Sequence, residues 1–209
     1  MDPLFLAELN ERLFVHFSQG LWRAPLGQRL LPVRPEGVAR WGQIVCGDTR
    51  DAQRALSGVA VGGVPDGAGL TAAWARASAG AARLRAIEGF TDQARGEPPL
   101  GPVPGPLIVL SAADAPLPDL VALLIARAAQ GVVWKPAPRA AASAHYVMRA
   151  LAPAAAGRLA LVQGDHRSGA DLARHGTVIW ASEAPVPADL TPLVSVPVVR
   201  AWATDPRRR

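Results

Sequence analysis

The chain contains a single lysine, Lys135, in the run Gly-Val-Val-Trp-Lys-Pro at 131–136. The β-branched run predicts a short strand that ends at the lysine. Ligands of open α/β sheets bind at the carboxyl ends of parallel strands. A lysine placed there, a compact charge on a long stem, suits a phosphate or a ribose hydroxyl. The alternative interpretation is one surface lysine in an arginine-biased chain.

A second candidate is the run Gly-Asp-His-Arg-Ser-Gly at 164–169, a glycine-bracketed loop before a short predicted helix. Its backbone amides could bind a phosphate at the helix amino terminus. It lacks the G-x-G-x-x-G pattern of dinucleotide-binding loops. His166 could transfer a proton or be an ordinary loop residue. Spacing typical of a zinc site is absent from the four histidines, His16, His145, His166 and His175.

Nucleophilic catalysis has weak support. The single cysteine, Cys46, follows Ile44 and Val45 and has no histidine beside it in sequence, so we expect a structural role. One cysteine excludes an internal disulfide and is typical of a reducing compartment. Ser168 and Ser182 lie outside any G-x-S-x-G motif. No catalytic set follows from the sequence.

The first 97 residues predict an amino-terminal hairpin and helical segment. A hairpin is expected over 13–17 and 21–23, with Gly20 in its turn. Strands are expected over 30–33 and 43–46, and helices over 3–12, 50–56 and 71–87, with Asp48 or Thr49 capping the second helix. The glycine-rich stretch 58–69 is expected to be a loop. A proline-rich linker follows over 98–106.

Strands and helices alternate regularly over 107–190. Strands are predicted over 106–110, 132–134, 159–163 and 178–181, and helices over 118–129, 140–151 and 170–175. This order predicts right-handed crossovers and a parallel sheet, hence a Rossmann-like α/β fold with helices on both faces. Residues 191–209 are expected to form an edge strand and a basic tail, with the whole chain one compact unit.

Composition narrows the function classes. The 209 residues carry a formal charge of +5 and a pI near 10.8, from dispersed arginines rather than a basic stripe. Nucleic-acid binding is therefore not expected. No apolar stretch reaches the roughly 18 residues that span a bilayer, and no signal peptide opens the chain. We expect a soluble, cytoplasmic protein.

Four stretches occur in order in the second half: Ser-Ala-Ala-Asp-Ala-Pro-Leu (111–117), Gly-Val-Val-Trp-Lys-Pro-Ala-Pro (131–138), Leu-Val-Gln-Gly-Asp (161–165) and Trp-Ala-Ser-Glu (180–183). In their order and spacing they resemble the cofactor domain of the aldehyde dehydrogenase superfamily. The stretches 17–25 and 43–56 are similar to the family's opening hairpin and the strand and helix after it. The resemblance covers about four-fifths of the chain, and no single motif is intact.

The resemblance implies that an NAD or NADP site, if retained, would use Lys135, Pro136, Gly164, Ala112 and Ser182. The sequence also departs from the family. Asp114 stands at the asparagine that helps hold the oxyanion, and a carboxylate there would repel a developing alkoxide. Pro138 replaces the glutamate that contacts the adenosine ribose, which favours the 2′-phosphorylated cofactor. Glu183 replaces a serine beside the pyrophosphate.

The leading hypothesis is a catalytically inactive aldehyde-dehydrogenase-like domain, a pseudoenzyme with no segment matching the family's catalytic half. It would act as an oligomerisation or accessory partner of itself or of a full-length relative, with residues 193–202 as a pairing strand. The alternative is an NAD(P)-binding oxidoreductase-type protein that uses the residual cofactor site; if active, it would be an aldehyde oxidoreductase. A third possibility is a folded product without a selected role.

Overall fold

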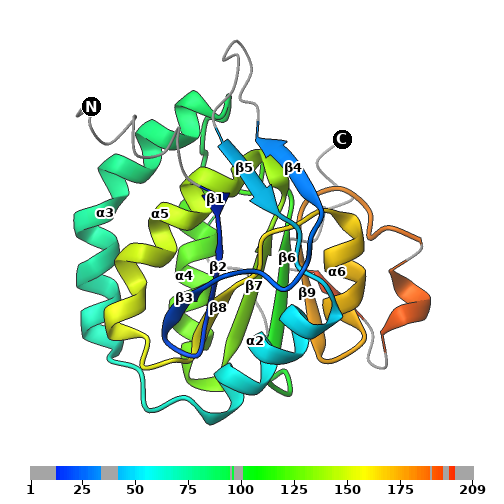
Figure 1. The fold of residues 1–209 in the computed structure, drawn as a ribbon. Helices are drawn as coiled ribbons and strands as arrows, with labels where there is room; N and C mark the ends of the chain where they lie inside the picture. Colours follow the sequence, from blue (N-terminus) through cyan, green and yellow to red (C-terminus); the bar gives the residue numbers. More distant parts are fainter. Residues whose placement is uncertain are drawn as a thin grey trace.

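A computed structural model describes residues 13–33, 42–94, 96, 101–188, 190–194 and 198–200 (Figure 1). The helix expected over 3–12 lies outside the described residues. The main sheet has seven strands in the order β10-β9-β6-β7-β8-β2-β3. These strands are β10 (Val199–Arg200), β9 (Thr177–Ala181), β6 (Leu107–Ser111), β7 (Val132–Pro136), β8 (Leu159–Leu161), β2 (His16–Ser18) and β3 (Leu21–Arg23).

The strands from β10 to β8 are parallel, as the alternating second half predicts. The β2–β3 hairpin extends the same sheet in the antiparallel sense, with Phe17 opposite Leu161 of β8. Its turn holds Gln19 and Gly20 at φ values of 54° and 73°. That left-handed pair is the geometry that tight two-residue hairpins require. The Rossmann-like α/β fold with an amino-terminal hairpin is confirmed.

Helices cover both faces of the sheet (Figure 1). On one face lie α3 (Gly67–Ile87), α4 (Leu117–Arg127) and α5 (Ala141–Leu151); on the other lie α2 (Thr49–Val61) and α6 (His166–Ala173). Alternate residues of β6 serve the two cores, Leu107 and Val109 on the first face and Ile108 and Leu110 on the second. This two-residue period is the normal pleat of a strand.

The expected strand over 13–17 is wrong in one respect, because two short strands in different sheets replace it. β1 (Leu13–Phe14) pairs with β5 (Gly42–Val45), which also pairs with β4 (Leu30–Val33), giving a second, three-stranded sheet. After Val15, the chain enters the main sheet as β2, where Phe17 packs 5.1 Å from the ring of Trp22.

The loop expected over 58–69 is also wrong. α2 continues to Val61 because Val59 is fully buried against the sheet, and only 62–66 separate it from α3. Gly58 serves packing rather than turning, since a Cβ there would lie 2.7 Å from the Gln19 side chain of the hairpin. In the part of the chain that the structure describes, no helix is long and apolar enough to cross a membrane.

Candidate functional site

A cavity of about 260 Å³ lies at the carboxyl edge of the parallel strands. Residues after β6, at the end of β7 and after β9 line it, together with the first turns of α6. This is the edge where open α/β sheets bind their ligands. The lining is largely apolar: Leu110, Ala112, Ala113, Ala137, Pro138, Ala170, Trp180, Pro187, Leu190 and Leu193.

Lys135 is the cationic group of this lining. It lies at the carboxyl end of its strand, as predicted, and β7 includes it and Pro136 beyond the expected range 132–134. Because Val133 packs in the core beneath α2 and α6, the pleat also directs Lys135 to that face. Its side chain is 7% exposed and passes Gly169, where an added Cβ would lie 3.8 Å from the lysine Cδ.

Burial lowers the pKa of Lys135 from its ordinary 10.5 to about 8, although Asp165 and an ionised Cys46 act in the opposite direction. Among the described residues, no hydrogen bond or ion pair within 4 Å engages its amine. With this pKa the amine is still mostly protonated at neutral pH, but a larger fraction of it is uncharged than in an exposed lysine.

Of the five residues that the sequence assigns to a cofactor, Lys135 and Ala112 line the cavity, and the other three lie outside its lining. Pro136 pairs with Ser111 in the sheet. The Ser182 hydroxyl accepts a hydrogen bond from the amide of Ala184 at 3.0 Å, within its own turn. Gly164 is buried where a Cβ would collide with the side chain of Ser168, so it serves close packing.

The loop at 164–169 is not an open anion site, which corrects the sequence-based expectation. α6 begins at His166 rather than near 170, and Asp165 caps it by accepting hydrogen bonds from the amides of Arg167 and Ser168. Both oxygens of the Asp165 carboxylate also bind Arg29, whose hydrogen bond holds the pKa of Asp165 at about 2. A protein carboxylate therefore occupies the amides that a phosphate would need.

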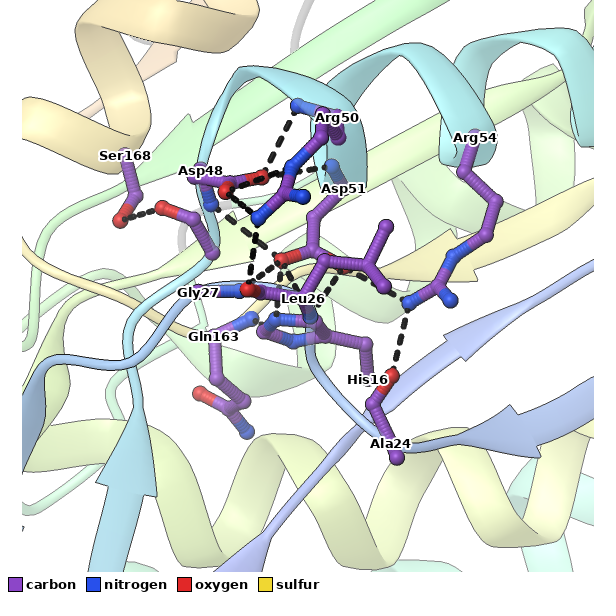
Figure 2. Close-up of polar contacts among 11 residues, drawn as sticks. His16, Ala24, Leu26, Gly27, Asp48, Arg50, Asp51, Arg54, Gln163 and Ser168 are labelled. Atoms are coloured by element: carbon purple, nitrogen blue, oxygen red, sulfur yellow. Dashed lines mark hydrogen bonds and ion pairs between the residues drawn. The ribbon is translucent and has the colours of Figure 1, made fainter.

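A buried polar network joins β2, the loop after β3, α2 and the residues after β8 (Figure 2). His16 Nδ1 accepts from the amide of Gln163 at 3.0 Å, which leaves Nε2 facing Asp51 at 3.6 Å. Asp51 also accepts from the amides of Leu26 and Gly27. These contacts, with His16 first among those that lower it, hold the pKa of Asp51 near 2 despite burial.

One further bond ties α6 to this network, since the Ser168 hydroxyl donates to the Gly47 carbonyl at 2.8 Å. The Gly47 amide in turn donates to the Gln163 carbonyl at 2.9 Å. Cys46 immediately precedes this point and is held through its amide by the Arg29 carbonyl. The network thus sets the position of α6 and of the groups that surround Lys135.

Comparison with solved structures shows which known fold the chain shares. The chain matches an NAD⁺ complex of an aldehyde dehydrogenase from Bacillus cereus with a TM-score of 0.68 and 16% identity, covering 86% of this chain and 48% of that one. It folds as about half of an aldehyde dehydrogenase. A putative aldehyde dehydrogenase from Burkholderia cenocepacia is 22% identical, with a TM-score of 0.63 and coverage of 79% and 46%.

A third match is the Δ-pyrroline-5-carboxylate dehydrogenase of Mycobacterium tuberculosis bound with NAD and cobalamin, at a TM-score of 0.62, 18% identity and coverage of 84% and 44%. The chain therefore spans less than half the length of these structures. No protein-family model matches the sequence, and no curated protein does. The resemblance to the aldehyde dehydrogenase superfamily is confirmed at the level of fold.

The positions that depart from the aldehyde dehydrogenase pattern lie around this edge. Asp114 is exposed and outside the cavity lining, whereas Pro138 forms part of it. Glu183 is exposed in the turn after β9. Arg85 holds the loop after β6 by donating to the carbonyls of Ala113 and Ala115 at 2.7 and 3.2 Å. The buried guanidinium of Arg85 therefore fixes the loop that carries Asp114.

The sequence did not single out several cavity residues. His166, which the sequence places after a parallel strand at the ligand edge as a proton-transfer or loop residue, lines the cavity as the first residue of α6. Trp180, Leu190 and Leu193 join the lining from β9 and the segment after it. An indole at the end of a strand was a usable signal, because strand ends meet at this edge. The residues after β9 carried no such pattern.

Cys46 and the histidines do not form a reactive or metal centre. Cys46 is 2% exposed, and burial raises the pKa of its thiol. No group of three metal-ligating side chains occurs within the described ranges of the chain. Cys46 thus lacks the stabilised thiolate that nucleophilic cysteines need.

Proposed function

We propose that this chain is an aldehyde-dehydrogenase-like domain that binds the adenosine end of NAD or NADP and does not itself oxidise aldehydes. The observation that carries the proposal is the lysine-containing apolar cavity at the carboxyl edge of the parallel sheet. An apolar cleft with a few convergent polar groups is the usual form of a small-molecule site. Lys135 would donate to a ribose hydroxyl or a phosphate.

The volume and charge of the cavity favour binding of the adenosine end of the dinucleotide. A volume of about 260 Å³ lies just below the range of about 300–1,000 Å³ typical of complete ligand sites. A planar base would pack against the apolar walls supplied by Trp180 and Leu190. The pyrophosphate has less support, because Asp165 occupies the amides at the start of α6 and places a negative charge there.

The lack of an activated nucleophile among the residues that the structure describes supports the second part of the proposal. The cysteine of this chain, Cys46, is buried with a raised thiol pKa. A thiohemiacetal requires a thiolate and donors aimed at its oxyanion. Asp114, at the family's oxyanion position, offers a carboxylate instead of an amide donor.

Calorimetric titration of the full chain with AMP, NAD and NADP tests the proposal. We expect AMP and NAD to bind in the same affinity range, since the contacts belong to the adenosine end. Lys135→Ala should weaken binding about tenfold, the equivalent of one charge-assisted hydrogen bond. Arg83→Ala, an exposed change on α3, is the matched control and should bind as the parent does. No heat with any nucleotide at millimolar concentration would refute the proposal.

NADP provides a further comparison. Because Pro138 rather than an acidic residue lines the cavity, no carboxylate there excludes a 2′-phosphate. We therefore expect NADP to bind at least as tightly as NAD. Tighter binding of NAD would place the ribose away from Pro138.

A specific observation also favours a role in assembly. The outer strand β3 of the main sheet exposes 57% of Leu21, and the outer strand β4 of the small sheet exposes 54% of Leu30. Edge strands with apolar side chains are sites of pairing with another chain. We propose a second copy of this chain, or a full-length aldehyde dehydrogenase relative, as the partner.

A further inference from the structure

We propose that Lys135 is a covalent modification site, at which small apolar aldehydes condense with the lysine amine inside the cavity to form an imine. The site is the one described above, but the inference does not rest on nucleotide binding. It rests on the placement of a primary amine within an apolar cavity.

The geometry presents the amine to the cavity from one side. Lys135 lies on the α6 face of β7, and its stem passes Gly169 and the end of Leu110. Because Gly169 has no side chain, α6 leaves room beside the lysine Cδ. No hydrogen bond within the described part of the chain occupies the amine. A carbonyl compound in the cavity therefore meets an amine without a competing acceptor.

Burial leaves Lys135 partly neutral, although the charged groups around it act in the opposite direction. Asp165 at the start of α6 and Cys46 after β5 face it, and His166 lines the same cavity. Arg29 pairs with Asp165 and so offsets its charge. Burial lowers the lysine pKa to about 8. At pH 7, the uncharged fraction exceeds that of a lysine with an ordinary pKa by roughly three hundredfold, and the uncharged amine is the nucleophile.

The lining selects the aldehyde. The cavity that Lys135 lines is also lined by the hydrocarbon side chains of Leu110, Leu190 and Leu193 and the indole of Trp180. An uncharged aldehyde with a small aromatic or branched aliphatic group gains contacts there.

The step is a condensation and needs no oxidant. The amine nitrogen of Lys135 adds to the carbonyl carbon, one of its protons moves to the oxygen, and a carbinolamine forms. The carbinolamine then loses its hydroxyl group and the remaining nitrogen-bound proton as one molecule of water, as the C=N bond forms. Hydride from sodium cyanoborohydride reduces the protonated imine to a stable secondary amine.

The composition makes the experiment simple to interpret. The sequence has two primary amines, the α-amine of Met1 and Lys135. The full chain is treated with benzaldehyde and cyanoborohydride at pH 7, and peptide mass spectrometry measures the benzyl group at each amine. We expect labelling of Lys135. Labelling confined to Met1 would overturn the proposal.

A matched variant tests whether fast labelling depends on the position of the lysine in the cavity. Lys135→Arg combined with Arg83→Lys moves the amine to an exposed position on α3 without changing the charge. We expect the introduced lysine to label at least tenfold more slowly than Lys135 at pH 7, and the difference to shrink as the pH approaches 10. Equal rates at pH 7 would overturn the proposal. Unchanged thermal unfolding of the variant shows that it folds.

Competition with AMP distinguishes this inference from the proposed function. If AMP slows labelling of Lys135, both proposals are supported. If Lys135 labels rapidly at every AMP concentration, the aldehyde site stands and the nucleotide site at Lys135 fails. If AMP binds by calorimetry while Lys135 does not label, the nucleotide site stands and the aldehyde site fails.

Discussion

Glu88 offers the sharpest test of how this fold accommodates a buried carboxyl group. It follows α3 and is fully buried, and its Oε1 accepts from the amides of Ala142 and Ser143 at 3.1 and 3.0 Å. It therefore caps the amino terminus of α5 from another helix. Its Oε2 has no hydrogen-bond partner among the described residues, and the Arg85 guanidinium lies 3.8 Å away. Burial raises the pKa of Glu88 from 4.5 to about 7.

The raised pKa of Glu88 determines how the stability of the fold changes with pH. The folded state holds the Glu88 proton more tightly than the unfolded state does. Its contribution is therefore fully present below pH 4.5 and is lost as the pH rises through about 7. The difference between the two pKa values corresponds to about 3 kcal/mol, of which about 2–3 kcal/mol disappears between pH 5 and pH 8.

Glu88→Gln removes the ionisation while keeping an oxygen to cap α5. Urea unfolding at pH 5, 6, 7 and 8 measures the free energy of unfolding of both proteins. We expect the parent to lose about 2–3 kcal/mol more than the variant over this range. Asp114→Asn, which removes an exposed carboxylate, controls for the change in net charge. Parallel pH curves for the parent and Glu88→Gln would refute the reasoning.

Two other predictions concern packing and assembly. Gly164→Ala should lower the free energy of unfolding by about 1–3 kcal/mol, because its Cβ would collide with Ser168. Gly101→Ala, where a Cβ meets nothing within 4 Å, should be nearly neutral in the same urea assay. Light scattering should show a dimer or larger assembly that Leu21→Lys weakens at least tenfold in dissociation constant, since a charge would enter the exposed edge of β3. A monomer at every concentration tested would contradict self-association.

The regular part of the fold was predictable because strand and helix periods dominate it. The buried run at Leu107–Ser111 and the β-branched run before Lys135 are typical of strands covered on both faces. The hairpin followed from Gly20 in its turn. The capping residue of α2 was also among those expected: Asp48 accepts from the amides of Arg50 and Asp51.

What the sequence left undetermined depends on contacts between distant segments. Gly58 suggests a loop when only its neighbours in sequence are considered, but the hairpin packs against it. Asp165 suggests an anion loop in the same way, but Arg29, 136 residues away in sequence, binds it. The cavity needs the residues after β9, and neither Leu190 nor Leu193 belongs to a periodic pattern. The sequence pattern around Lys135 could place it at the carboxyl edge of the sheet. It could not predict which distant residues surround the lysine.

Those surroundings change the chemistry that the edge can perform. A helix amino terminus with free amides would attract a phosphate, but here Asp165 already accepts from two of the first amides of α6. A ligand in the cavity meets apolar walls and one partly neutral amine, not an anion-binding terminus. The capping by Asp165 thus weakens the case for a bound pyrophosphate. It strengthens the case for ligand groups that react with an amine or form a hydrogen bond with it. Removing the carboxylate with Asp165→Asn should therefore move the balance back toward anionic ligands, and raise NAD binding more than AMP binding.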